Sequence, residues 1–147
     1  MKKRYTQILI VLSFILALAV NASAHCEIPC GIYDDQMRIN LIKEHITTIE
    51  KSMIQIMKIE KEERHHSNQL VRWIMNKEHH SDKLQEIVTQ YFMTQRIKLD
   101  TQNYEKKLGL LHQLLIFSMK CKQTIDTKNT DQLKKIVKDF QAIYFDK

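Results

Sequence analysis

The sequence predicts an all-α protein folded as an antiparallel four-helix bundle, preceded by a short irregular N-terminal segment. Its 147 residues contain two glycines, Gly31 and Gly109, and one proline, Pro29, so almost nothing breaks a helix after residue 35. Apolar residues recur at helical spacing in four stretches that short polar turns separate. Amphipathic helices joined in this way usually pack as an antiparallel bundle.

Residues 1–24 have the pattern of a secretory signal peptide. Residues 2–4 are basic, residues 8–20 form an apolar run, and residues 22–24 read Ala-Ser-Ala, a small-residue cleavage site. One alternative is an uncleaved membrane anchor, but the apolar run is shorter than the roughly 20 residues that span a bilayer. A lipoprotein is disfavoured because His25 stands where the lipidated cysteine would have to be.

Cleavage after Ala24 would leave 123 residues, enough for one domain with a modest core. It would also lower the formal net charge from +6 to +3, because it removes the three basic residues near the start. The remaining basic residues form no run, so we expect neither nucleic acid binding nor a polybasic membrane patch. The sequence thus predicts an exported protein, periplasmic or extracellular, with no stable membrane anchor after cleavage.

The predicted bundle domain occupies residues 34–147. Asp34 or Asp35 is placed to cap its first helix. The polar stretch at residues 60–68 should end that helix. Its apolar stripe consists of Ile42, Ile46, Ile49, Met53 and Met57.

Three further helical segments follow. Apolar residues at 70–74 and 84–92 predict either one long helix or two short ones. A polar turn at 98–103 leads to a third helix, and a cap within 127–131 leads to a fourth. The apolar residues of these last two helices include Leu108, Leu111, Leu115, Phe117, Met119, Leu133, Ile136, Val137, Phe140, Ile143 and Tyr144.

Residues 25–33 carry the donor groups of a predicted metal-binding hook. The His25 amine and the deprotonated Cys26 amide nitrogen would close a five-membered chelate ring with a metal, and that nitrogen with the Cys26 sulfur would close another. Cys30 returns a second thiolate if the chain folds back over Pro29. Two nitrogens and two thiolates in a plane suit nickel(II) or copper(II), whereas zinc prefers a tetrahedron. Such donors also favour a higher oxidation state, so the site can cycle by one electron.

Other readings of the cysteines and histidines remain open. Cys26 and Cys30 could form a short-loop disulfide in an oxidising compartment, although three cysteines leave at least one unpaired. We expect Cys121 to be a buried, small apolar residue. The neighbours in His65-His66 and in His79-His80 point to different sides of a helix, so these pairs are expected at the solvated surface rather than as ligands.

The stretch HCEIPCGIYDD, residues 25–35, resembles the N-terminal nickel-binding hook of nickel superoxide dismutases, whose motif reads His-Cys-x-x-Pro-Cys-Gly-x-Tyr at the mature terminus. The motif also coincides with the predicted cleavage site. Its fixed positions are filled by His25, Cys26, Pro29, Cys30, Gly31 and Tyr33.

The resemblance implies a right-handed four-helix bundle assembled as a homohexamer, which disproportionates the small anion superoxide to oxygen and hydrogen peroxide. It implies nickel held by the His25 amine and imidazole, the Cys26 amide and thiolate, and the Cys30 thiolate. It also implies a catalytic role for Tyr33, which would stand over the open face of the metal and limit access to small anions. A cis peptide bond before Pro29 is implied as well, which only X-Pro bonds adopt at low cost.

The helices depart from the family pattern at two places. A glutamate that supports the imidazole falls at about Asn40 in this chain, and a Tyr-Phe-Lys segment that draws in superoxide reads Tyr91-Phe92-Met93, without the lysine. Arg38, Arg96 or Lys98 could supply the missing positive charge.

Two functions follow from these patterns. The first is a nickel-dependent superoxide dismutase that cycles between nickel(II) and nickel(III). The alternative is an exported helical protein that binds or delivers nickel or copper without turnover. An assay of superoxide loss on the nickel-loaded chain separates the two.

Overall fold

The computed structural model describes residues 4–8, 11, 13, 31–62 and 66–146. From residue 31 onward, the described chain is helical apart from its turns and contains no strand, which confirms the predicted all-α class. The elements are α2 (Asp35–Ile59), α3 (Ser67–Glu86), the π-helix η2 (Ile87–Arg96), α4 (Tyr104–Gln123) and α5 (Lys128–Phe145).

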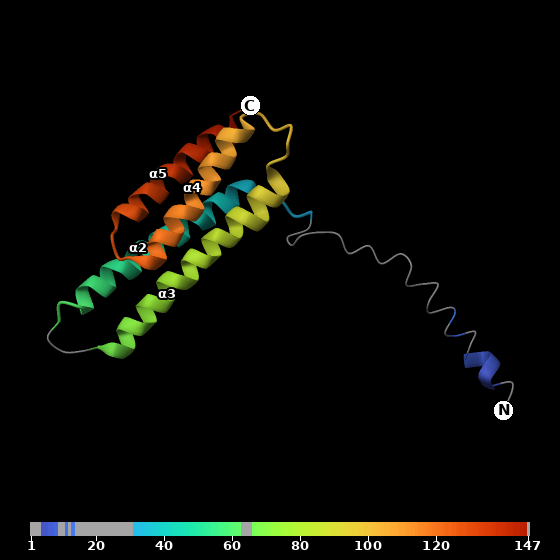
Figure 1. Ribbon diagram of the computed structural model, residues 1–147, viewed down its shortest axis with the longest axis horizontal. Coiled ribbons are helices and arrows are strands. Elements are labelled where there is room, and N and C mark those ends of the chain that lie inside the picture. Colours follow the sequence, from blue (N-terminus) through green and yellow to red (C-terminus); the bar gives the residue numbers. More distant parts are fainter. Residues whose placement is uncertain (1–3, 9–10, 12, 14–30, 63–65, 147) are drawn as a thin grey trace.

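The helices form an antiparallel four-membered bundle, in which η2 continues α3 without a break (Figure 1). The second segment is therefore one long rod rather than two short helices. Helix α2 packs against α3 and α5, and α4 packs against the same two helices. Their apolar stripes meet in one core, whose largest fully buried side chains are Tyr91, Phe92, Phe140, Ile39, Ile42, Ile46, Ile49, Met53, Leu84, Leu111, Leu114 and Leu133.

Local polar groups fix where the helices begin and end. Asp34 is the N-cap of α2, and its Oδ1 accepts a hydrogen bond of 2.8 Å from the Met37 amide. This confirms one of the two predicted caps. Asn103, which precedes α4, adopts the left-handed region at φ 57°, which asparagine tolerates better than most residues. The predicted turn at 98–103 falls between η2 and α4, whereas the one predicted at 60–68 follows α2 but runs two residues into α3.

Not every apolar residue of the predicted stripes is buried. Val71 and Ile74, on the first half of α3, are exposed. In Figure 1 the hairpin of α2 and α3 extends beyond α4 and α5 at the end opposite the C-terminus, so the two shorter helices do not cover this part. No helix within the described ranges is both long enough and apolar enough to cross a membrane.

Candidate metal centre

The predicted ligands His25, Cys26 and Cys30, and the predicted cleavage site after Ala24, lie outside the described residues. The described chain resumes at Gly31, directly after the last predicted ligand. In the ranges that are described, no group of three or more His, Cys, Asp or Glu side chains is placed to hold a metal ion. The described part of the site consists of the residues that link the predicted ligands to the bundle.

Gly31 and the residues after it turn the chain into α2. Gly31 has φ 71°, a left-handed conformation that costs a residue with a Cβ about 1–2 kcal/mol. A Cβ at this position would meet no atom within 4 Å. The requirement for glycine is therefore conformational rather than steric.

A charged network anchors the start of α2. The Arg96 guanidinium donates from Nε to Oδ1 of Asp35 and from Nη2 to Oδ2, each at 2.8 Å. The Tyr91 hydroxyl donates to Oδ1 at 2.6 Å, and the Tyr144 hydroxyl donates to Oδ2 at 2.8 Å. Asp35 thus receives four hydrogen bonds and joins α2 to η2 and α5.

These contacts change the protonation of the partners. Burial acts to raise the pKa of Asp35, but the hydrogen bonds from Arg96, Tyr91 and Tyr144 outweigh it, so the pKa lies below its ordinary value. Burial, followed by the hydrogen bond to the Asp35 carboxylate, raises the pKa of Tyr144 to about 12 and that of Tyr91 well above its ordinary value. Both hydroxyls therefore stay protonated at neutral pH and remain donors.

Tyr33, the predicted catalytic residue, packs against this network. Its ring centroid lies 4.4 Å from Cζ of Arg96, a cation–π contact, and 6.1 Å from the Tyr91 ring centroid. The side chain keeps 49% of its surface exposed. The structure therefore brings Tyr33 together with Arg96 and Tyr91 and leaves much of its ring accessible.

The π-helix η2 explains how Tyr91 and Arg96 both reach Asp35. An α-helix with 3.6 residues per turn places residues five apart about 140° around its axis. In η2 the bonds run from residue i+5 to residue i, as between the Ile97 amide and the Phe92 carbonyl oxygen at 2.9 Å. Tyr91 and Arg96 are separated by one such turn. π-Helical segments often occur at functional sites, and helical periodicity at 100° per residue gives no sign of this one.

The three cations considered for the missing lysine differ in their partners. Arg96 is neutralised by Asp35. Lys98 is exposed and follows η2. Arg38, on α2, places its guanidinium 5.0 Å from the Tyr91 ring centroid. Asn40, which stands at about the position expected for a supporting glutamate, is exposed, and its Oδ1 accepts a hydrogen bond of 2.9 Å from Gln36.

The remaining cysteine and the described histidines differ in how far they are buried. Cys121 is fully buried, as predicted, and burial raises its thiol pKa to about 12. His79 is exposed, as expected, but His80 is half-buried and its Nδ1 lies 3.0 Å from Nδ1 of His45 on α2. His66 is exposed, and its neighbour at position 65 is not among the described residues.

Sequence reasoning singled out Tyr33, whose catalytic role stays a prediction, but it missed the network around this residue. Asp35 was considered only as a helix cap, and Tyr144 only as part of an apolar stripe. Arg96 was considered only as a source of positive charge. Because Asp35 lies 61 residues from Arg96 and 109 from Tyr144, no local pattern could have paired them.

A family model described as nickel-containing superoxide dismutase matches residues 20–147. This range takes in the predicted hook as well as the whole bundle. No curated protein and no solved structure matches the chain.

Proposed function

The chain belongs to the family of nickel-containing superoxide dismutases, and from this premise we propose that its nickel is bound by the hook residues His25, Cys26 and Cys30. The activity of the chain is that of the family: two superoxide ions and two protons become oxygen and hydrogen peroxide. When bound, nickel supplies the one-electron chemistry by alternating between the +2 and +3 states. No observation on the described residues favours the alternative of a metal carrier without turnover.

The states of the three cysteines support this assignment of ligands. Thiolates, not thiols, are the sulfur ligands of metals. Cys121 is fully buried with a thiol pKa of about 12, so it stays protonated and unavailable to a metal at neutral pH. Cys26 and Cys30 are the other two cysteines of the sequence. With the His25 amine and the Cys26 amide nitrogen they would supply two nitrogens and two sulfurs, a donor set that suits nickel(II).

Tyr33 is proposed to limit access to the metal. It follows Cys30 by three residues, and Arg96 and Tyr91 hold its ring from the bundle side. Because Arg96 is itself fixed by two hydrogen bonds to Asp35, the ring rests on a rigid support. A ring held in this way can admit a small anion and exclude larger ligands without having to move.

Export and assembly complete the proposal. The pattern of residues 1–24 supports a signal peptide whose removal exposes the His25 amine, so that the protein works in the periplasm or outside the cell without a stable membrane anchor. The resemblance of the hook supports a homohexamer.

The ligand assignment is tested by replacing each cysteine. We expect Cys26→Ser or Cys30→Ser to lower superoxide turnover of the nickel-loaded, processed protein to background, because a hydroxyl does not replace a thiolate as a soft donor. Helicity by circular dichroism should change little, because the bundle buries its apolar stripes without the hook. Cys121→Ala is the matched control and should keep its turnover and its nickel content. Turnover near wild type in Cys26→Ser or Cys30→Ser would reject the assignment.

A further inference from the structure

Arg38 is a half-buried cation for whose side chain the described residues supply no polar partner. Among the described residues its side chain makes no hydrogen bond and no ion pair, and its Nε is buried without any acceptor. Its one contact of note is with the face of Tyr91. A buried donor left without a partner costs about 1–3 kcal/mol, which makes the Arg38 Nε unusual. The two terminal nitrogens of the guanidinium are not buried in this way, and with no partner among the described residues they are open to an acceptor from outside the chain.

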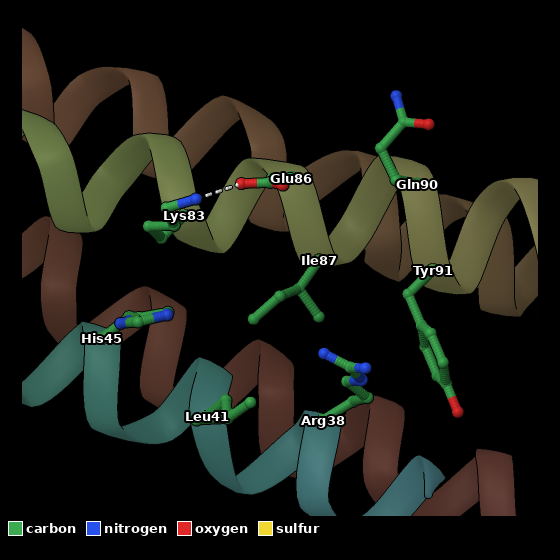
Figure 2. A pocket seen from close by; sticks show the side chains of 8 residues that line it. All are labelled: Arg38, Leu41, His45, Lys83, Glu86, Ile87, Gln90 and Tyr91. Atoms are coloured by element: carbon green, nitrogen blue, oxygen red, sulfur yellow. Dashed lines mark hydrogen bonds and ion pairs between the residues drawn. The ribbon is translucent and has the colours of Figure 1, made fainter. Parts of the chain in front are cut away.

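A groove stands next to this guanidinium. It lies between α2 and the rod of α3 and η2, with a volume of about 210 Å³. Figure 2 shows Arg38 reaching from α2 towards the facing rod, with His45 and Lys83 further along the groove and Tyr91 beside it. The groove is lined by Arg38, Leu41, His45, Lys83, Glu86, Ile87, Gln90 and Tyr91.

The charges around the groove leave an excess of one positive charge. Glu86 is the acid in the lining, and it pairs with Lys83 at 2.7 Å. Burial and then the charge of His80 lower the pKa of His45, so that imidazole is neutral at pH 7. Asp35, beyond Tyr91, is already paired with Arg96. The Arg38 guanidinium is therefore uncompensated, and it suits a ligand with a single negative charge.

We propose that this groove is a binding site for a small monovalent anion held by Arg38, and that superoxide occupies it on its approach to the Tyr33 end of the bundle. The use of the site by superoxide rests on the proposed function, whereas the anion site itself does not. Superoxide is a small monovalent anion. An uncompensated charge in a groove concentrates such an anion and raises its rate of association.

The position of Arg38 connects the groove to the hook. The guanidinium lies 5.0 Å from the Tyr91 ring centroid, which lies 6.1 Å from that of Tyr33. Arg96 contacts Tyr33 directly, but its positive charge is already balanced by the Asp35 carboxylate, to which it donates two hydrogen bonds. Lys98 is exposed to solvent, where salt screens its charge. Of these three cations, Arg38 is thus the one that the described residues leave both partly buried and unpaired.

The first experiment measures anion binding. The arginine side-chain Nε–H signals of the processed protein, both metal-free and nickel-loaded, are followed by NMR during titration with sodium nitrate at constant ionic strength. We expect one arginine signal, absent from Arg38→Gln, to shift saturably. Arg38→Lys should retain nitrate-dependent shifts in neighbouring amides, which Arg38→Gln should lose. Arg72→Gln, which removes an exposed arginine of α3, should bind nitrate as the wild type does. No saturable shift, or unchanged binding in Arg38→Gln, would overturn the site.

The second experiment measures the use of the site by superoxide. In nickel-loaded protein we expect Arg38→Gln to lower kcat/KM by roughly threefold to tenfold and to flatten its dependence on ionic strength. Arg38→Lys should recover most of both. Loss of nitrate binding with unchanged kcat/KM and unchanged salt dependence would refute the role in superoxide approach. The ligand assignment fails separately, because Cys26→Ser should abolish turnover yet leave nitrate binding intact.

Discussion

At the scale of single residues, Asp35 is the charge on which the hook end of the bundle depends. It is one residue past the N-cap of α2, where a negative charge is favoured by the helix dipole. It also accepts from Arg96, Tyr91 and Tyr144. Tyr33 in turn rests on Arg96. Removing this one carboxylate would therefore loosen contacts in three elements and the support of the proposed catalytic ring.

Asp35→Asn should lower the free energy of unfolding at pH 7 by about 2–4 kcal/mol, because it leaves the Arg96 charge half-buried without its ionic partner. The folded-state pKa of Asp35 is lower than its ordinary value of 3.8. Its contribution is therefore present above about pH 4 and is lost as the pH falls through the folded-state pKa. Urea unfolding at pH 7, 4 and 2 measures this difference.

The wild-type protein should thus exceed Asp35→Asn in stability at pH 7, and the gap should narrow towards pH 2. Asp100→Asn, at an exposed position after η2, is the control and should match the wild type within about 0.5 kcal/mol at each pH. A gap that stays constant with pH would mean that the Asp35 carboxylate does not stabilise the fold through its charge.

At the scale of the elements, the sequence predicted where the helices lie but not which of their side chains are in contact. Sparse glycine and proline, apolar periodicity and the Asp34 cap were enough to predict the rods and their turns. The π-helix could not be predicted because its local sequence is compatible with an ordinary α-helix. The tertiary contacts of Tyr91 and Arg96 favour the wider turn instead. The exposure of Val71 and Ile74 could not be predicted from the sequence, because it depends on how far the partner helices extend.

The two glycines of the chain offer a matched pair of substitutions. Gly31→Ala should lower turnover by roughly tenfold or more, because a left-handed residue with a Cβ is strained and the hook then leaves the bundle in another direction. Gly109→Ala lies within α4, where a Cβ meets nothing within 4 Å. It should raise the free energy of unfolding by about 0.5–1 kcal/mol and leave turnover unchanged.

Superoxide turnover and urea unfolding of both variants measure these effects. If Gly31→Ala kept full turnover, the positive φ would not matter to the position of the hook. If Gly109→Ala also lost turnover, the effect of Gly31→Ala could not be assigned to the turn.

At the scale of the whole molecule, the proposed homohexamer makes a simple prediction. The nickel-loaded, processed protein should have, by light scattering after size-exclusion chromatography, six times the mass of its chain measured in denaturant. The exposed apolar residues on the projecting part of α2 and α3, such as Ile54, Val71 and Met75, are consistent with a surface that is covered in an assembly. A single species at the mass of one chain would contradict the hexamer.

We propose that cleavage before His25 creates the metal site by releasing a primary amine that serves as a ligand. Inserting one alanine between Ala24 and His25 turns that amine into an amide and leaves Cys26, Cys30 and the whole bundle in place. Nickel-dependent superoxide turnover of this variant, beside the correctly processed chain at equal nickel content, is the most direct measurement. We predict a folded protein with turnover at or near background, whereas turnover comparable to the correctly processed chain would show that the amine is dispensable.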